Sequence, residues 1–510
     1  MRLTYKKIAA VLAVGMLVMG CAHREEKKAQ EKKNDTVLTI LVQQSGTNMT
    51  GTWEGKGAEK LYEDTGIRLE FYSNGNGEEK RLKQYLAAGT LPDIIGFRDM
   101  EQAELLMGAG VLLNLDEQKE VLTEVFETPE YETALRYYRE NYGGEQENLY
   151  FLPTSVGKQD ENEYFWMPMM QWNAYEKAEF PEINTLGDYL NATEQMREKK
   201  AMTALGDPVY GFSLCGDWSE RKMQQPSALL GLYGMEVGTV SPLIAVDAQT
   251  DTIHCITEED SPYKQALHFY FEANQRKLLD PDSGTQSFEK LQEKYETGQI
   301  LFSGYDWQTG GYGDTAEDGT KQNDSYIPIL AEDMKIYKDP DNPVGGNWFF
   351  AVNKNSEKGK QACTLLNWLY TPENIAYLYQ EKEGSDWYSG KNERAVFQWL
   401  GLTKATVTEK DTAKESRKEI SRNAVEGSQA VYMMGPLPVE LRKTETQIQE
   451  MVETLSWEMI YAEDEETFEQ LWGEMIQKSA ELGGERLNEY YQQEWKEALK
   501  KEQIYGTIEK

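Results

Sequence analysis

Residues 37–97 alternate short apolar runs with amphipathic segments, and this alternation restricts the fold more than any other feature of the chain. The β-branched run at residues 37–42 is typical of a buried strand, and residues 67–71 alternate apolar and polar side chains as a half-buried strand does. Apolar side chains at helical spacing precede Gly66 and Gly89, which predicts a helix before each glycine. The short run "IIGF" then supplies a third strand.

Strand, helix, strand, helix and strand in this order indicate parallel strands joined by helical crossovers, so the N-terminal region is predicted to be an α/β lobe. Later strand-like stretches, "NLYFLPTSVG" and "NWFFAVNK", are separated by mixed sequence, and the last part of the chain is mainly helical. The 510 residues exceed what one hydrophobic core usually supports, so we expect more than one lobe.

The N-terminus has the order of a secretory signal. Arg2, Lys6 and Lys7 precede an apolar run that is too short to span a bilayer, and Cys21 follows it directly. The residues "VMGC" resemble a bacterial lipobox, in which the cysteine is lipidated and becomes the first residue of the mature chain. Residues 22–34 are then a charged tether. The alternative is an ordinary secreted protein in which Cys21 is incidental.

Composition excludes some classes of function. The formal net charge of -34 repels nucleic acid, so no nucleic-acid partner is expected. Beyond Cys21 the chain has only Cys215, Cys255 and Cys363, too few and too widely spaced for a disulfide framework. We expect three buried free thiols, with a bridge between Cys215 and Cys255 as the alternative.

Catalytic and cofactor motifs are missing from the sequence. The three histidines are isolated, and neither a G-x-S-x-G elbow nor a complete phosphate-binding loop is present. Asp280 and Asp282 begin with the spacing of a calcium loop, but Thr285 and Leu291 stand where that loop needs Gly and Glu. We therefore expect no enzyme, no cofactor and no metal. A divergent calcium site, and a glycosidase that uses two of the many carboxylates, remain open alternatives.

Several tryptophans lie in polar surroundings rather than in apolar patterns. An indole beside a hydrogen-bonding side chain suits a sugar, because a sugar ring offers an apolar face and a rim of hydroxyl groups. The alternative is a tryptophan buried at a lobe interface. The candidates, with their polar neighbours, are Trp53, Trp166, Asp217 with Trp218, Asp306 with Trp307, and Asn347 with Trp348.

The stretch "LYEDTGIRLEFY…LKQYLAAGTLPDIIGFRDMEQAELLMGAGVLLNLDE" resembles the bacterial extracellular solute-binding proteins of ABC importers, in particular the sugar-binding branch that includes maltodextrin-binding protein. "YFLPTSVG" is similar to the first crossover of that family. "NWFFAVNKNSEKGKQACTLLNWLYTPEN" is similar to its returning strand and helix.

The resemblance implies an α/β fold with the two-lobed periplasmic-binding-protein type II architecture and a ligand cleft between the lobes. It also implies hinge closure on binding. The expected organisation is a signal peptide at 1–20, a lipidated tether at 21–35, lobe 1 at 36–155 and 347–398, and lobe 2 at 156–346 and 399–510.

The resemblance also implies ligand contacts after the strands, at Gln44 and Ser45 and at Arg98 and Asp99, besides the tryptophans and their neighbours. The implied ligand is an oligosaccharide and the implied partners are the permease subunits of an ABC importer. We expect a monomer held outside the cytoplasm by a lipid on Cys21. A peptide binder or a sensor partner on the same scaffold is the remaining alternative.

Overall fold

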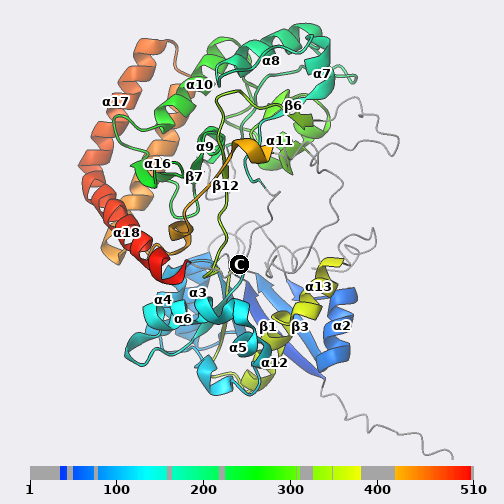
Figure 1. The fold of residues 1–510 in the computed structure, drawn as a ribbon, viewed down its shortest axis with the longest axis vertical. Helices are drawn as coiled ribbons and strands as arrows, with labels where there is room; N and C mark the ends of the chain where they lie inside the picture. Colours follow the sequence, from blue (N-terminus) through cyan, green and yellow to red (C-terminus); the bar gives the residue numbers. More distant parts are fainter. Residues whose placement is uncertain are drawn as a thin grey trace, which may run out of the picture.

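The computed structural model describes residues 35–42, 50–73, 78–157, 164–216, 224–305, 307–309, 326–346, 348–380 and 420–506. Two bodies lie one above the other in Figure 1, and we name them lobe 1 and lobe 2. Lobe 1 holds the N-terminal strands, and lobe 2 holds most of the middle of the chain together with the helices α16 (Val439–Ile460) and α17 (Glu465–Leu482). Within the described ranges, no helix combines the length and the apolar character that crossing a membrane requires.

Lobe 1 is built on a six-stranded sheet of strand order β2-β3-β1-β4-β13-β5. Strands β3 and β4 pair with β1 in parallel, whereas β13 pairs antiparallel with both β4 and β5. The expected strand-helix alternation is therefore confirmed. The strands are β1 (Thr36–Val42), β2 (Gly51–Thr52), β3 (Ile67–Ser73), β4 (Ile94–Phe97), β5 (Phe151–Pro153) and β13 (Phe349–Val352).

The helices of lobe 1 follow the predicted periodicity. Leu61 is buried on the face of α2 that packs on the sheet, and Gly66 ends that helix in the left-handed conformation. Helix α12 contributes the buried stripe that the sequence places after the returning strand. The helices are α2 (Lys56–Thr65), α3 (Glu78–Ala88), α4 (Met100–Gly108), α5 (Thr123–Glu127), α6 (Glu132–Tyr142), α12 (Gly359–Leu369) and α13 (Pro372–Gln380).

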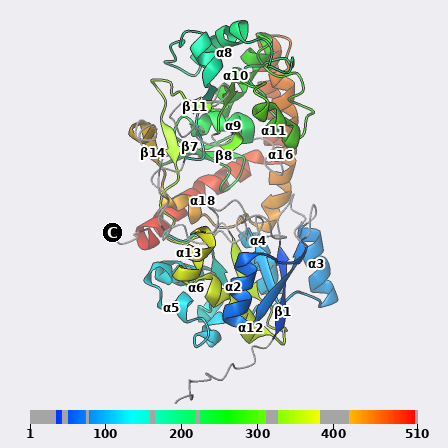
Figure 2. The same cartoon turned by 90° about the vertical axis from the view of Figure 1, so that its right-hand side faces the viewer.

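Lobe 2 contains smaller sheets surrounded by helices (Figure 2). Its three-stranded sheets have the orders β10-β6-β11 and β7-β8-β9. Their strands are β6 (Met169–Gln171), β7 (Met235–Val237), β8 (Ile244–Asp247), β9 (Thr252–Cys255), β10 (Phe302–Ser303) and β11 (Tyr326–Pro328). The helices are α7 (Trp172–Lys177), α8 (Asp188–Lys199), α9 (Gln224–Gly231), α10 (Tyr263–Gln275) and α11 (Phe288–Glu296).

Two chain segments connect the lobes side by side, and we call them the crossing segments: residues 154–157, and residues 342–346 with 348. Gly157 and Asn342 exchange both backbone hydrogen bonds, with N···O distances of 2.8 and 2.9 Å. The buried Asn342 carboxamide accepts from the backbone N–H of Gly345 at 2.8 Å. Strand β12 (Ile336–Lys338), which precedes the second crossing segment, pairs in parallel with β14 (Ala424–Glu426). The two crossing segments are therefore joined to each other by backbone hydrogen bonds where they pass between the lobes.

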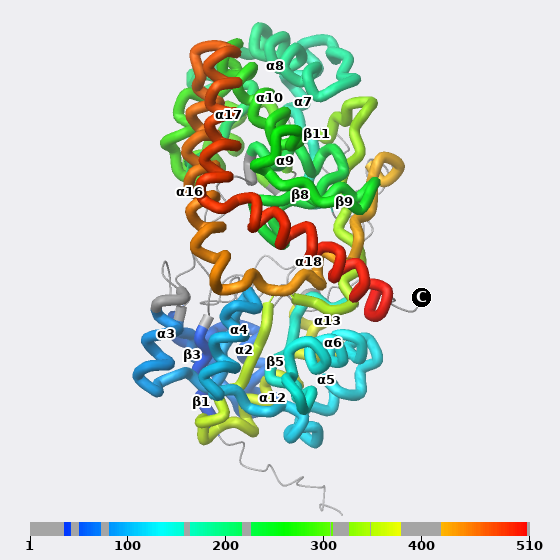
Figure 3. Tube along the Cα trace, turned by 90° about the vertical axis from the view of Figure 1, so that its left-hand side faces the viewer, coloured from blue at the N-terminus to red at the C-terminus, as the bar shows by residue number. Residues whose placement is uncertain are grey.

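The C-terminal helices cover lobe 2 and reach back to lobe 1. Helices α16 (Val439–Ile460) and α17 (Glu465–Leu482) form an antiparallel pair, and α18 (Gly484–Tyr505) runs from them toward α6 (Figure 3). On the lobe 2 side, the Trp495 indole N–H donates to the carbonyl of Asp251 at 2.8 Å. On the lobe 1 side, Arg136 donates to the carbonyl of Ile504 at 3.1 Å. Helix α18 therefore contacts both lobes.

The three cysteines of the described chain are buried and unbridged, which confirms the expectation of free thiols and excludes the bridge between Cys215 and Cys255. Burial raises the pKa of the Cys363 thiol to about 12. Burial and the neighbouring Glu258 carboxylate also raise the pKa of Cys255. Both groups are therefore protonated and unreactive near neutral pH.

Candidate functional site

The end of the lobe 1 sheet from which the crossing segments leave brings several predicted site residues together. Phe349 lies opposite the last residue of β4 on one side and the last residue of β5 on the other. Arg98 and Thr154 directly follow β4 and β5, and Trp348 directly precedes β13, so these three residues form a row across the end of the sheet. Because the crossing segments start here, this row lies at the end of the sheet that faces lobe 2.

The members of this row contact one another. The Arg98 guanidinium lies 5.4 Å from the centroid of the Trp348 ring, within the range of a cation–π interaction. The Trp348 backbone N–H donates to Thr154 Oγ1 at 3.0 Å, and the Thr154 N–H donates to the Trp348 carbonyl at 2.8 Å. Arg98 is exposed, whereas Trp348 is only 2% exposed. The row therefore presents a cation on an aromatic support.

Asp99, the next residue of the predicted set, begins helix α4. Its carboxylate accepts a hydrogen bond from the backbone N–H of Gln102 at 2.7 Å, which is the usual role of an N-cap. The side chain is exposed at the end of the sheet. The cap fixes the direction of the chain immediately after Arg98.

Strand β1 ends at the same edge of the sheet, since Val42 pairs with Gly96 of β4. The predicted residues Gln44 and Ser45 follow Val42 in the sequence. They lie outside the described residues, as do Cys21, Asp217, Trp218, Asp306 and Asn347, and so does the side chain of Trp307. For all of these the assigned roles stay predictions.

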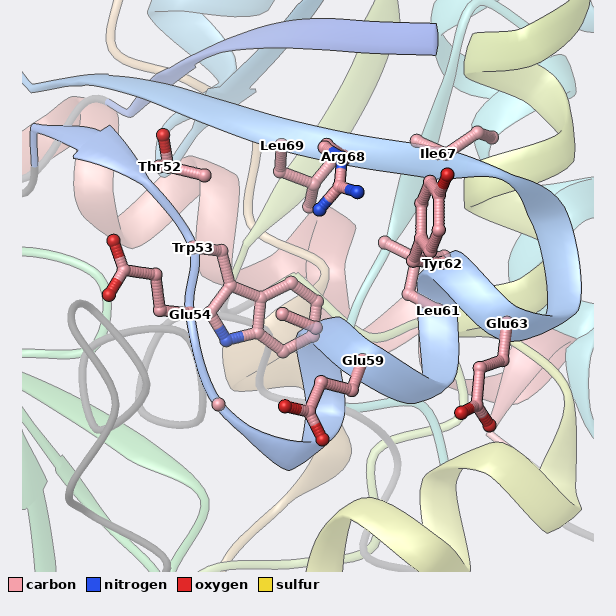
Figure 4. A pocket seen from close by; sticks show the side chains of 12 residues that line it. Thr52, Trp53, Glu54, Glu59, Leu61, Tyr62, Glu63, Ile67, Arg68 and Leu69 are labelled. Carbon is pink, nitrogen blue, oxygen red and sulfur yellow. The ribbon is translucent and has the colours of Figure 1, made fainter. Parts of the chain in front are cut away.

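Trp53 lies elsewhere, at the opposite edge of the sheet. A pocket of about 710 Å³ lies between helix α2 and strands β2 and β3, and Trp53 lines it together with Glu54 and Glu59 (Figure 4). The Trp53 ring is 3% exposed, and its indole N–H is buried with no hydrogen-bond partner among the described residues. Strands β13 and β5, where the crossing segments begin, are at the other edge. The structure therefore does not bring Trp53 together with Arg98.

Trp166 is an interior residue of lobe 2. It is 3% exposed and packs against helix α9, where a Cβ added at Gly231 would overlap the indole ring. Its neighbour Phe165 is 44% exposed, and the Phe165 ring stands edge-on to Trp166 with centroids 4.6 Å apart and to Tyr305 with centroids 5.6 Å apart. Phe165 is not among the residues predicted from the sequence. In a run of adjacent aromatics such as "EYFWMP", the sequence does not show which side chain is buried and which is exposed.

The two carboxylates with calcium-like spacing, Asp280 and Asp282, form ion pairs with a lysine. Asp280 is fully buried, and Lys294 Nζ of α11 lies 2.7 Å from its Oδ2 and 2.9 Å from Oδ2 of Asp282. Ser213 donates to the same Asp280 oxygen at 2.7 Å. Among the described residues, no group of three or more His, Cys, Asp or Glu side chains could hold a metal ion. At this loop the ammonium group occupies the position that a cation would take.

Fold and site together define a two-lobed α/β architecture in which polar and aromatic residues meet at the end of one sheet beside the crossing segments. The expected fold class is therefore confirmed. Residues 191–376 match the model of the family described as bacterial extracellular solute-binding proteins. The resemblance that the sequence shows to this family is confirmed as well. No curated protein is significantly similar to the chain.

Solved structures of low sequence identity share the fold over nearly the whole chain. An HMO-binding, ABC-transporter-associated solute-binding protein from Bifidobacterium longum infantis is 16% identical, with a TM-score of 0.60 over 91% of this chain and 99% of its own. The Streptococcus pneumoniae ABC-transporter substrate-binding protein FusA, in complex with kestose, is 13% identical, with a TM-score of 0.61 over 91% and 100%. An alginate-binding protein, in a structure without calcium ion, is 12% identical, with a TM-score of 0.59 over 90% and 98%.

Proposed function

We propose that this chain is a lipid-anchored solute-binding protein that captures an oligosaccharide outside the cytoplasm and delivers it to the permease of an ABC importer. The observation that carries the proposal is the shared fold: similar structures over about nine-tenths of the chain are binding proteins for oligosaccharides. The proposed role is binding and not catalysis. The lobe boundaries given above and a monomeric state belong to the same proposal.

The arrangement at the end of the sheet supports this role. A guanidinium group offers several N–H donors in one plane, which suits adjacent oxygen atoms of a sugar. The exposed Arg98 provides such a group beside the crossing segments. Hinge movement about these segments would bring lobe 2 over a ligand held at the row. Asp217 with Trp218, and Asp306 with Trp307, are proposed to contact the ligand from lobe 2.

Calorimetry tests the sugar claim directly. We expect saturable 1:1 binding to at least one member of a panel of glycans that proteins of similar structure bind, namely kestose, Man1GlcNAc (the ligand of an N-glycan transport solute-binding protein) and an alginate oligomer. Closure would bury an aromatic and hydrogen-bonding site around the glycan. Substituting Arg98→Leu is expected to weaken that binding by about tenfold or more, since a charge-assisted bidentate contact is lost. Tight binding of peptides with no response to a broad glycan panel would contradict the proposal, and sugar cleavage during incubation would replace it by a glycosidase.

The lipid anchor is tested separately. In a bacterial host that processes lipoproteins, the wild-type chain is expected in the membrane fraction, because acyl chains stabilise membrane binding by about 0.8 kcal/mol per buried methylene. The variant Cys21→Ala is expected to leave that fraction. The matched control Cys363→Ala changes a buried thiol of lobe 1 and should stay with the membrane. Equal membrane retention of both variants would rule out Cys21 as the attachment point.

A further inference from the structure

The row at the end of the lobe 1 sheet has an order that follows from strand register. Trp348 continues β13 by one residue and stands between Arg98 of the β4 chain and Thr154 of the β5 chain. Neighbours across a sheet are close enough for their side chains to interact. The placement of the Trp348 backbone beside Arg98 therefore follows from the register of β4, β13 and β5.

Burial separates the roles of the two side chains. Trp348 is 2% exposed, so its ring has little surface to offer a ligand, whereas Arg98 is exposed. The guanidinium lies 5.4 Å from the ring centroid, where the negative face of an indole attracts a cation. The sequence pattern groups Trp348 with the ligand-stacking tryptophans. Its geometry instead places it under the cation.

The backbone of Trp348 is bound to the first crossing segment. Two hydrogen bonds join Thr154 to Trp348. The Thr154 N–H donates to the Trp348 carbonyl at 2.8 Å, and the Trp348 N–H donates to Thr154 Oγ1 at 3.0 Å. The Thr154 carbonyl also accepts from Gly346 at 3.1 Å in the second crossing segment. The aromatic support of Arg98 is thus part of the connection between the lobes.

We infer that Trp348 is a positioning residue: it holds the Arg98 guanidinium at the end of the sheet so that its planar donors engage two adjacent oxygen acceptors of the ligand. The acceptors are either a carboxylate or a pair of neighbouring hydroxyl groups, which a guanidinium engages in the same bidentate geometry. The role of Arg98 as a ligand contact rests on the proposed function. The support of Arg98 by Trp348 does not.

The first experiment needs no ligand. Phenylglyoxal modifies arginine side chains, and peptide mass spectrometry gives the rate at each arginine of the folded protein. In Trp348→Leu the modification rate of Arg98 should rise about two- to fivefold, the factor that corresponds to loss of one cation–π contact. Trp348→Phe keeps an aromatic face and should retain most of the protection.

Arg442 is the internal control, because it pairs with Glu101 and Glu104 of α4, each at 3.0 Å, and does not touch an aromatic ring in the described contacts. Its rate should be the same in the wild type and in both variants. An unchanged rate at Arg98, or a rise that Arg98 and Arg442 share because the fold has loosened, overturns the inference.

The second experiment uses the member of the panel (kestose, Man1GlcNAc or an alginate oligomer) that binds in calorimetry. Trp348→Leu should weaken binding about two- to fivefold when Arg98 is present and should have no further effect in the Arg98→Leu background, because the tryptophan acts through the arginine. An equal loss in both backgrounds overturns the inference. Binding of the alginate oligomer alone assigns a carboxylate acceptor, and binding of a neutral glycan assigns a hydroxyl pair. If no glycan binds, the proposed function fails while the reagent experiment still decides the support of Arg98.

Discussion

Replacing Lys294 by Met is expected to lower the free energy of unfolding by about 3 to 5 kcal/mol, because it leaves the fully buried Asp280 carboxylate without its counter-ion. Methionine is close to lysine in length and apolar, so the change removes the charge with little change in packing volume. Equilibrium unfolding in urea, followed by tryptophan fluorescence, measures the loss. The hydrogen bond from Ser213 remains and does not compensate a buried charge.

Lys290 of the same helix provides the matched control. It pairs with Glu293, but both side chains are more than half exposed, so Lys290→Met should change the free energy of unfolding by less than about 1 kcal/mol. A second variant, Lys294→Met with Asp280→Asn, should recover part of the loss since no buried charge remains. Equal small losses in Lys294→Met and Lys290→Met would contradict the expectation.

The pH dependence has a definite sign. Desolvation lowers the pKa of Lys294, but hydrogen bonds to Asp280 and Asp282 outweigh it, and the net pKa lies above the ordinary value of 10.5. A raised pKa in the folded state contributes stability that is present below pH 10.5 and is lost as the pH rises through the folded-state value. The wild type should therefore lose more stability in strong alkali than Lys294→Met does.

Local sequence signals predict lobe 1 closely. The runs at residues 37–42 and 67–71 become β1 and β3 in parallel register, and the glycines that follow the apolar periodicities stand at or just after the helix ends. These signals are strong because β4, β5 and β13 are buried at every position, whereas β3 alternates buried and more exposed side chains as its sequence predicts. In lobe 2 the strands have two to four residues each, and such short runs carry too little periodicity to fix their bounds.

The candidate site was predictable in its location and less so in the roles of its members. Arg98 follows a strand, and strand ends are where open sheets place ligands, so its position follows from the sequence. The burial of Trp348 depends on which strands flank it. The strands that pair there are far apart in the chain, so a local sequence pattern carries no information about their pairing.

The Asp280 loop illustrates the same limit. The spacing of Asp280 and Asp282 is the only local indication of a cation, and it is ambiguous between a metal and a side chain. The deciding residue, Lys294, comes one helix later and reaches both carboxylates only after α11 has folded against the loop. Sequence reasoning could have found it by searching for a basic residue on the buried face of the next helix.

Substituting Gly345 by Ala is expected to lower the free energy of unfolding by about 2 to 4 kcal/mol, because backbone strain and steric overlap add at one position. Gly345 has a φ of +69°, in the left-handed region. A Cβ there would lie 2.5 Å from the Thr154 carbonyl oxygen and 2.7 Å from Cγ2 of Val156. Thr154 cannot retreat without losing its hydrogen bond to the Gly346 N–H. The substitution therefore perturbs both crossing segments. Equilibrium unfolding in urea measures the loss of free energy.

Gly89→Ala separates the two causes. Gly89 has a φ of +65°, but a Cβ at that position would have no atom within 4 Å, so only the strain remains and the loss should be about 1 kcal/mol. The difference between the two variants is then the cost of the overlap with Thr154 and Val156. An equal loss of free energy in both variants would mean that Thr154 and Val156 move aside for the Cβ at no cost. The first crossing segment would then be too loosely held for its two hydrogen bonds to Trp348 to keep the aromatic support of Arg98 in place.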